Sequence, residues 1–385
     1  MPNPTSLHPA RLANGLVYVN PDMPGLRRFK RGASFRYKDA QGRWLSDADD
    51  IARIRSLAIP PAYTDVWICP LPHGHLQATG LDARGRKQYR YHADWRVLKD
   101  EAKFERLEAF GLALPRIRAR VARDMKTGTV GAPLTRERVL ATIVRLLDTT
   151  FLRVGNETYA SSNGSFGLTT LRNHHAAVRG GALRLKFRGK SGVMHEATVD
   201  DARVARLVRR CQQLPGQELF QYQDDNGTPH GLSSTDVNDY LREAAGDNFT
   251  AKDFRTWHGT TQALELTRLA CNAKPDSQAG TQALRYNAKE IIAAVARQLG
   301  NTPAVCKKAY VHPAVLSLGS TLADDAGAMN DIWQKISGGT RARRLLHAAE
   351  ARLLAFLRAH RRNASVRAQP AASLKRTVSR SKSSV

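Results

Sequence analysis

The chain has 385 residues, and its hydrophobic fraction of 42% is typical of a globular protein and excludes wholesale disorder. Its formal net charge of +26 predicts a polyanionic partner, of which nucleic acid is the commonest, but it specifies no reaction. The sequence has no apolar run of membrane-helix length and no recognisable export signal, so we expect a cytoplasmic, nucleoid-associated protein without membrane contact.

Residues 1–95 are expected to form a small β-rich domain. An irregular lead-in over 1–30 precedes a helix in "SDADDIARIRSLAIPP", which Ser46 can cap and the Pro-Pro pair ends. The segments "TDVWICP" and "RKQYRYH" have the β-branched and aromatic content of short strands. Between them, "TGLDARG" has the composition of a turn.

The pattern from 96 onward is mostly helical. Thr135 is suited to cap a helix in "LTRERVLATIVRLLDTTFLRVG", in which apolar residues up to Phe151 recur at helical spacing. Thr250 and Asp253 have the spacing of a capping box at the start of another helix. In "ALRLKFRGKSGVMHEATV", near 182–199, apolar and basic residues alternate around a "GKSG" turn. This segment therefore predicts a β-hairpin, with Lys190 at its tip.

The sequence around Tyr310 predicts a helix that stops and another that starts. "NAKEIIAAVARQLG" ends at Gly300, a common helix-terminating residue, and Thr302 can cap a new helix whose first residue is Pro303. We therefore expect a short helix near 303–312 that carries Tyr310.

The last part of the chain is strongly basic. An amphipathic helix is expected around 341–360, followed over 361–385 by a tail with Lys and Arg but no Asp or Glu, which we predict to be disordered. The elements together predict an α+β fold, with a β-rich domain over 1–95 and a larger, mostly α-helical domain over 96–360.

The cysteines and histidines do not have the spacing of a metal site. The four cysteines lack any C-x-x-C pair and are expected to be free thiols, and the paired histidines have no carboxylate or cysteine at ligand spacing. "RGKSG" is not a phosphate-binding P-loop, because arginine stands where that motif needs its first glycine. We predict no metal and no cofactor. The residues considered are Cys69, Cys211, Cys271, Cys306, His73, His75, His174 and His175.

Several further residues are individually uninformative, since a lone arginine, lysine or tyrosine usually has a structural role. In order along the chain, however, "FLRVGNETY", "KFRGKSGVMHE", "KDFRTWHGT" and "LGNTPAVCKKAY" resemble the active-site motifs of type IB DNA topoisomerases, in particular the small poxvirus-like and bacterial members. "IPPAYTDVWI" and "GHLQATGLDARGRKQYRYH" resemble the DNA-clamping domain of that family. The resemblance spans roughly residues 25–320.

The resemblance implies a catalytic domain of the tyrosine recombinase/type IB topoisomerase kind in a monomer that forms a clamp around double-stranded DNA. Tyr310 would attack a phosphodiester to form a 3′-phosphotyrosyl bond, so that supercoils relax and the strand reseals without ATP or an obligatory metal. Arg153 and Arg255 would clamp the phosphate, and Lys190 would protonate the 5′-oxygen. Asn301 stands where many members have histidine; it can donate a hydrogen bond but carries no charge.

The resemblance also implies DNA contacts outside the reaction centre. Lys252 would steer the phosphate, and Tyr159 matches a DNA contact of the family. Gln88, Tyr89 and Tyr91 match residues that enter the major groove in the viral enzymes, where glutamine can read adenine and the tyrosines can touch thymine methyl groups or phosphates. Alternating aromatic residues in a strand are otherwise core residues, and both interpretations stay open at this point.

Two alternative functions also stay open. A tyrosine site-specific recombinase shares the Arg-Lys-Arg-Tyr chemistry, but its signature has histidine where this chain has Lys252, and its N-terminal domain is usually helical. A noncatalytic basic DNA-packaging protein would account for the charge and the tail, but it would not need an ordered Tyr310.

Overall fold

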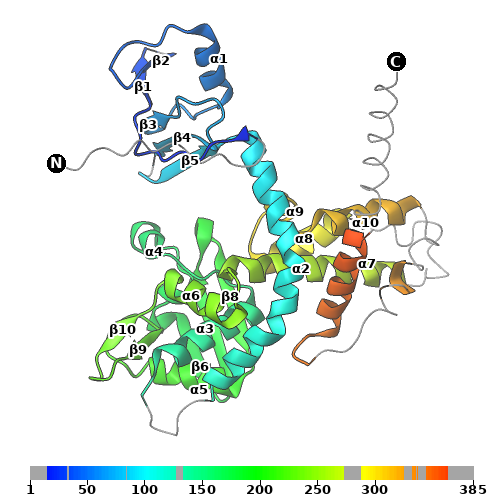
Figure 1. Ribbon diagram of the computed structural model, residues 1–385. Helices are drawn as coiled ribbons and strands as arrows, with labels where there is room; N and C mark the ends of the chain where they lie inside the picture. Colours follow the sequence, from blue (N-terminus) through cyan, green and yellow to red (C-terminus); the bar gives the residue numbers. More distant parts are fainter. Residues whose placement is uncertain are drawn as a thin grey trace, which may run out of the picture. The chain divides into compact units, whose positions relative to one another are not determined.

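The chain forms two units, Met1–Lys103 and Phe104–Val385, whose elements are labelled in Figure 1. The computed structural model describes the backbone of residues 15–32, 34–83, 85–126, 133–272, 288–324, 332–334, 336 and 344–362. The side chains of 97–102, 271–272 and 319–324 are outside this description, and Cys271 is one of them. Nearly all of the tail expected over 361–385 is also outside it.

The first unit contains a five-stranded antiparallel sheet in the order β2-β1-β3-β4-β5. Helix α1, Ala48–Ser56, packs on one face of this sheet through Ile54, which is buried against Leu26, Val66 and Ile68. The β-rich N-terminal domain predicted from the sequence is therefore confirmed. Its strands are β1, Leu26–Arg31; β2, Ser34–Lys38; β3, Thr64–Ile68; β4, Leu76–Leu81; and β5, Lys87–Tyr91.

Three local expectations for this unit are wrong. The irregular lead-in does not extend to residue 30, because Leu26 is buried opposite Ile68 and begins β1. Asp47, rather than Ser46, caps α1, since its carboxylate accepts a hydrogen bond of 2.8 Å from the backbone N–H of Asp50. The turn in "TGLDARG" is shorter than expected because its first three residues pair with β5 as part of β4.

The second unit is mostly helical, as the sequence predicted. Helix α3 lies at its centre, and nearly all of its residues from Val139 to Asp148 are buried. A further helix runs over 348–362, later than the one expected around 341–360. The other helices are α2, Ala93–Asp124, which crosses the boundary between the units; α4, Glu157–Asn163; α5, Ala202–Cys211; α6, Ser234–Ala245; α7, Ala251–Asn272; α8, Ala288–Leu299; α9, Pro303–Ala309; and α10, Pro313–Asp324.

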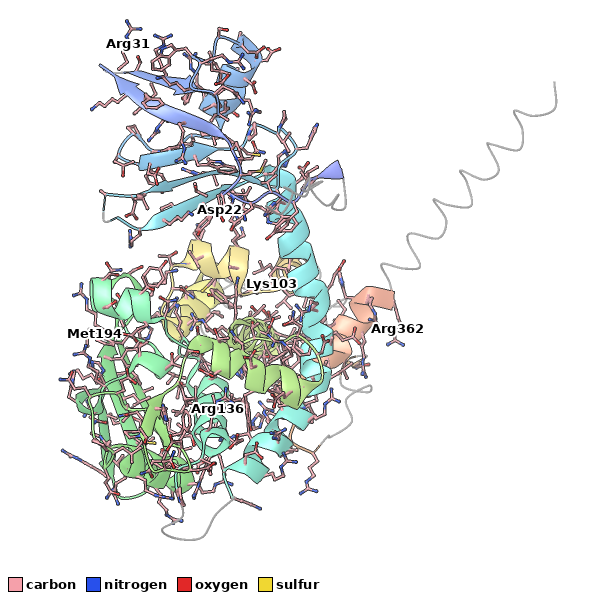
Figure 2. The ribbon with its side chains drawn as sticks, turned by 60° about the vertical axis from the view of Figure 1, so that its left-hand side comes forward. Asp22, Arg31, Lys103, Arg136, Met194 and Arg362 are labelled. Carbon is pink, nitrogen blue, oxygen red and sulfur yellow. The ribbon has the colours of Figure 1, made fainter. Side chains whose placement is uncertain are left out.

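Among the residues of this unit that the structure describes, five strands accompany these helices. Strands β6, Ala176–Arg179, β7, Ala182–Arg188, and β8, Met194–Val199, form an antiparallel sheet, and β9, Gln221–Gln223, pairs with β10, Pro229–Gly231. Apolar side chains of β7 alternate inward onto the helical core. Met194, at the start of β8, lies on the surface of the unit (Figure 2). Among the described residues, no helix has the length and apolar character needed to span a bilayer.

The ends of α3 and α7 are set by nearby capping residues. The hydroxyl of Thr135 accepts the N–H of Arg138 and caps α3. Phe151 is not part of that helix, in contrast to the sequence-based expectation: it is the C-cap, with a left-handed φ of 60°. At the start of α7, the carboxylate of Asp253 accepts hydrogen bonds from both the N–H and the hydroxyl of Thr250, as the predicted spacing allows.

Candidate active site

Tyr310 directly follows a short helix, α9, which ends at Ala309 and so does not extend to 312 or include Tyr310, in contrast to the expectation. Gly300, with φ of +58°, turns the chain out of α8, and Thr302 caps α9 by accepting the N–H of Val305 at 3.4 Å. Pro303 occupies the first turn of α9, where its missing N–H costs nothing. Tyr310 is the C-cap residue, and its N–H donates to the carbonyl of Cys306 at 3.0 Å. The short helix therefore fixes the backbone from which the phenol projects.

Helix α7 holds Tyr310 from the other side. The hydroxyl of Thr260, a fully buried residue, donates to the Tyr310 carbonyl at 3.2 Å and accepts the N–H of His312 at 3.2 Å. A side chain at Gly259 would place its Cβ 2.8 Å from the same carbonyl, so only glycine allows this approach. Our sequence reasoning missed both residues, although they follow Arg255 on one helix within the same quoted motif.

Arg255 ties two helix ends to the tyrosine. It is only 3% exposed, and it donates to the backbone carbonyls of Phe151, at the end of α3, and of Leu299, at the end of α8. Its guanidinium carbon lies 5.0 Å from the centroid of the Tyr310 ring. Its Nε is buried and, among the described residues, has no hydrogen-bond partner. One N–H of Arg255 is thus unused by the fold.

Arg153 is held by a close backbone crossing. The N–H of Leu168 donates to the Arg153 carbonyl at 2.9 Å, and a Cβ at Gly167 would lie 2.6 Å from the Cα of Gly155, whose φ is +116°. From this loop the Nη2 of Arg153 donates to the side-chain oxygen of Asn301. The Asn301 carbonyl group is therefore occupied, and its amide nitrogen is the group that can still donate.

Three buried donors in this cluster lack acceptors in the part of the chain that the structure describes: Nη1 of Arg153, Nε of Arg255 and Nδ2 of Asn301. A buried donor without a partner costs about 1–3 kcal/mol, so three of them gathered beside one tyrosine indicate a site for an acceptor. Burial, and then the neighbouring charge of Arg255, lower the pKa of Arg153 from its usual value. An anion with several oxygens would satisfy the donors and relieve the repulsion between the two cations.

The same charges act on the phenol of Tyr310. Burial alone would raise its pKa, but the charge of Arg255 and a hydrogen bond from it, followed by the charges of Arg153 and Lys252, lower the pKa below its usual value of 10. Lys252 lies exposed in the first turn of α7. The phenolate, which is the nucleophilic form of tyrosine, therefore forms more readily at Tyr310 than in a free tyrosine.

Lys190 lies in the turn of the β7–β8 hairpin. The turn closes through the N–H of Gly189, which donates to the carbonyl of Val193 at 2.7 Å, and the Lys190 side chain is exposed. The end of β7 is joined to the segment after α4, since the N–H of Phe166 donates to the Arg188 carbonyl at 2.9 Å; Leu168 of the same segment donates to the Arg153 carbonyl. The structure thus brings together four of the five expected catalytic residues and leaves the fifth on an adjoining hairpin.

The expected DNA-reading residues do not share one surface. Tyr89 and Tyr91 are 47% and 38% exposed and stack with ring centroids 6.2 Å apart on one face of β5. Gln88 lies on the opposite face, because side chains alternate along a strand, and its amide donates to Asp82 at 2.9 Å. These three residues belong to the first unit, whereas Tyr159, exposed on α4, belongs to the second.

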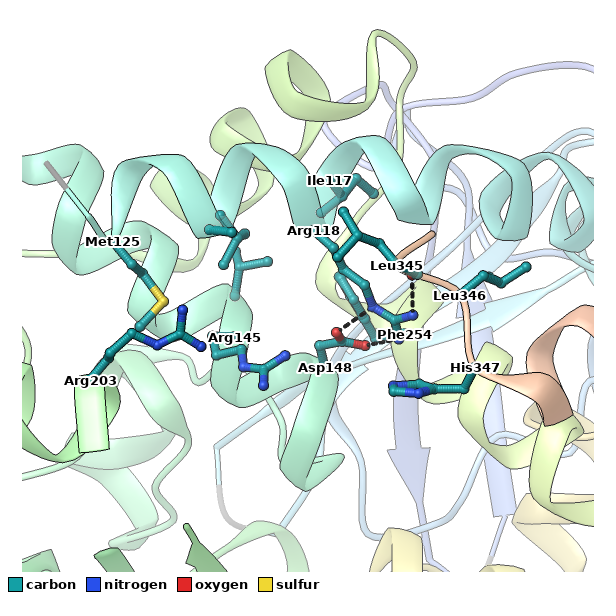
Figure 3. Close-up of a pocket in the computed structure, with 13 residues that line it drawn as sticks. Ile117, Arg118, Met125, Arg145, Asp148, Arg203, Phe254, Leu345, Leu346 and His347 are labelled. Carbon is teal, nitrogen blue, oxygen red and sulfur yellow. Dashed lines mark hydrogen bonds and ion pairs between the residues drawn. The ribbon is translucent and has the colours of Figure 1, made fainter. Parts of the chain in front are cut away.

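A buried ion-pair network lies behind the site. Arg118, on α2, makes two hydrogen bonds of 2.7 and 2.8 Å to Asp148, on α3 (Figure 3). It makes two more of the same lengths to Glu350. It lines a cavity of about 380 Å³. The network reaches α7 through Trp257, whose indole N–H donates to Glu350 at 3.0 Å, and through His258, 3.3 Å from Asp148.

Asp148, His258 and Glu350 are close enough together to be considered as metal ligands, since their donor atoms lie within 4.8 Å of one another. The guanidinium of Arg118, however, already bonds all four carboxylate oxygens and supplies the positive charge between them. We therefore interpret the group as a structural ion-pair network. The ring of His258 lies 4.5 Å from that of Phe151, so the network supports the turn that leads to Arg153.

Replacing Arg118 by alanine is expected to destabilise the protein by about 3–5 kcal/mol, because it leaves two buried carboxylates without their cation. Denaturant unfolding measures the change. The matched control is Arg184→Ala, which breaks a surface pair with Glu196 whose side chains are 59% and 52% exposed, and should cost about 1 kcal/mol or less. Equal losses in the two variants would show that the network does not stabilise the fold.

Comparison with known proteins covers both units. Residues 34–82 match the family described as bacterial DNA topoisomerase IB, N-terminal domain, and residues 92–330 match the family described as eukaryotic DNA topoisomerase I, catalytic core. The second match extends over the whole cluster around Tyr310.

Individual relatives agree with these family matches. DNA topoisomerase 1B of Acanthamoeba polyphaga mimivirus is 32% identical over 300 residues, which are 77% of this chain and 88% of the viral protein. DNA topoisomerase 1B of vaccinia virus (strain Copenhagen) is 26% identical over 280 residues, 69% of this chain and 80% of that protein. DNA topoisomerase 1 of Mycosarcoma maydis is 30% identical over 216 residues, 49% of this chain but 21% of that protein.

Proposed function

This chain belongs to the type IB DNA topoisomerase family and is an isomerase acting on DNA, and from this premise we propose that it relaxes supercoils through a covalent bond between Tyr310 and a DNA 3′-phosphate. The observation that carries the proposal is the cluster in which Arg255 lies over the Tyr310 ring and three buried donors lack acceptors within the described residues. A DNA phosphodiester is an anion that matches those donors.

In this mechanism the scissile phosphate binds between Arg153 and Arg255. Their unused N–H groups, together with the amide of Asn301, bond its non-bridging oxygens, where negative charge accumulates as Tyr310 attacks. Guanidinium groups suit this role because they are permanently charged and donate in a fixed, forked geometry. The donors are already fixed by helix ends and by Asn301, so little reorganisation is needed when the phosphate binds.

Tyr310 first loses its phenolic proton to solvent; the phenolate oxygen then bonds to phosphorus as the bond to the 5′-oxygen of the next nucleotide breaks. We propose that Lys190 donates a proton to that oxygen and recovers it when the 5′-hydroxyl attacks the phosphotyrosine and reseals the strand. The bond energy is conserved in the ester, so neither step consumes ATP. Between the two steps the nicked duplex rotates and supercoils are released.

Further parts of the proposal concern DNA binding. Tyr89 and Tyr91 offer an exposed aromatic face, and Tyr159 and Lys252 are exposed in the unit that holds Tyr310, so we propose all four as DNA contacts. Gln88 can read a base only after it releases Asp82. One chain supplies every residue of the mechanism, which supports action as a monomer around duplex DNA.

The test of this function is the relaxation of a negatively and a positively supercoiled plasmid by the full chain in EDTA without ATP. We expect both plasmids to relax, because the proposed chemistry uses only side chains. Relaxation that requires added Mg²⁺ and stays absent in EDTA under all salt conditions would contradict the proposed metal-free mechanism. Exchange of strands between two plasmids, without relaxation, would instead support the recombinase alternative.

Replacing Asn301 by histidine is expected to change the cleavage rate by less than about tenfold, which corresponds to about 1.4 kcal/mol. A neutral imidazole can accept from Arg153 with one nitrogen and donate to the phosphate with the other, as Asn301 does with its oxygen and nitrogen. Single-turnover cleavage measures the rate. Asn301→Leu, which lacks both groups, is the control and should lose much more; equal rates for the two variants would exclude the hydrogen-bonding role.

A further inference from the structure

His195 lies in the same cluster, and the proposed mechanism gives it no role. It belongs to β8, opposite Phe187 of β7, and the two rings stack with centroids 5.5 Å apart. We propose that His195 is a positioning residue that joins the Lys190 turn to the Gly300–Asn301 turn, so that the proton donor and the phosphate site keep a fixed separation. This inference deepens the proposed function and rests on it.

His195 packs against two glycines, Gly189 and Gly300, neither of which leaves space for a side chain. A Cβ at Gly189 would lie 2.4 Å from Cδ2 and 2.8 Å from Nε2 of the imidazole, and a Cβ at Gly300 would lie 2.3 Å from Cε1. All three distances are too short for a real Cβ contact. The imidazole therefore fills the space between the two turns and touches the backbone of each.

Gly189 is the more informative of the two. Gly300 has φ of +58°, so its backbone conformation alone favours glycine. Gly189 has φ of −98° and ψ of −163°, an extended conformation open to other residues, so the backbone does not explain the glycine. The close approach of His195 explains it, because any side chain at position 189 would collide with the imidazole. The residue directly before Lys190 therefore leaves space for a histidine from the neighbouring strand.

The imidazole of His195 contacts two turns that each carry a proposed catalytic residue. Lys190 directly follows Gly189, and Asn301, which accepts from Arg153, directly follows Gly300. One imidazole therefore separates the residue proposed to protonate the leaving oxygen from one proposed to bind the phosphate. Burial, then the charges of Arg153 and Arg255, lower the pKa of His195, which favours the neutral ring over a further positive charge beside the two arginines.

The test separates leaving-group protonation from the other parts of the reaction. In an ordinary duplex the departing 5′-oxygen needs a proton, whereas in a duplex with sulfur at that position the group leaves as a thiolate and needs none. If His195 positions Lys190, its removal should slow cleavage of the oxygen substrate and leave the sulfur substrate nearly unaffected. Lys190→Ala provides the reference pattern for a lost proton donor.

With the full chain in single-turnover cleavage, we expect His195→Ala to slow the oxygen substrate by about 10²-fold, the lower end of the range for general acid catalysis, and the sulfur substrate by less than about tenfold. Gly189→Ala retains the histidine but displaces its ring, and it should show the same pattern. His230→Ala, an exposed histidine on β10, is the control and should cleave both substrates at the wild-type rate.

Equal slowing of both substrates by His195→Ala and Gly189→Ala would overturn the inference, since it would place the defect in phosphate binding or in the fold. So would an unchanged rate in both variants. The melting temperatures of the variants identify a general loss of folding. If wild type and Lys190→Ala do not differ on the oxygen substrate, the proposed role of Lys190 fails first, which distinguishes failure of the mechanism from failure of this inference.

Discussion

Tyr310→Phe is expected to abolish plasmid relaxation and to leave DNA binding nearly unchanged. The substitution removes one oxygen, the proposed nucleophile, and retains the ring over which Arg255 lies. It also retains the Tyr310 carbonyl that accepts from Thr260, so the local backbone should not move. Plasmid relaxation measures the activity, and a gel-shift titration with a short duplex measures the binding.

The matched control for this variant is Tyr222→Phe. Tyr222 is a partly buried tyrosine on β9, and its loss of a hydroxyl should leave relaxation at the wild-type rate. A Tyr310→Phe protein that relaxes DNA at the wild-type rate would exclude Tyr310 as the nucleophile. A protein that loses binding together with relaxation would mean that the phenol is needed to hold DNA rather than to cleave it.

Arg255→Gln is expected to slow cleavage by about 10³–10⁵-fold, the range for removing an arginine that stabilises a phosphoryl-transfer transition state. The variant should also depend differently on pH. Reactive phenolate forms as pH rises through the pKa of Tyr310, and Arg255 is the leading cause that lowers this pKa. Without its charge the pKa rises, so the residual activity should reach its half-maximum at a higher pH than in the wild type. Single-turnover rates across an alkaline pH series measure both effects.

Arg268→Gln, also on α7, is the control for this experiment, because Arg268 lies nearer the other end of the helix and pairs with Glu265. It should have the rate and the pH profile of the wild type. Arg255→Lys keeps a positive charge but cannot donate to both the Phe151 and Leu299 carbonyls, so its pH profile should move less than that of the glutamine variant. An unchanged pH profile in Arg255→Gln would show that Arg255 does not activate the tyrosine.

The sequence predicted the elements whose signals are local. The cap at Thr135, the glycine and proline around α9, and the alternation in β7 each lie within one element, so the physical cause is readable from neighbouring residues. The order of Arg153, Lys190, Arg255 and Tyr310 pointed to the family for a related reason: the motifs around them are continuous in the chain.

Features that depend on distant residues were not predicted. Arg118 and Glu350 are separated by more than two hundred positions, and nothing near either residue in the sequence indicates the other. Strand β1 was missed because "LRRFKR" is basic, and it is strand pairing together with the burial of Leu26 that makes it a strand. The opposite directions of Gln88 and Tyr89 could have been predicted, because neighbouring residues in any strand face opposite sides.

The role of His195 could be predicted from the sequence only in part. Its motif was part of the resemblance, but its proposed role depends on two glycines, one six residues earlier and one more than a hundred residues later. Glycine at 189 is visible in the sequence only as part of a turn. The structure shows that a side chain from another strand fills the space that this glycine leaves free.

The covalent bond between Tyr310 and DNA is tested most directly by denaturing the enzyme during turnover on a duplex and identifying the DNA-linked residue by mass spectrometry. We expect one linked peptide, containing Tyr310, with the DNA attached through its 3′-phosphate and a free 5′-hydroxyl on the other side of the nick. A link to another residue, or to a 5′-phosphate, would contradict the proposed mechanism.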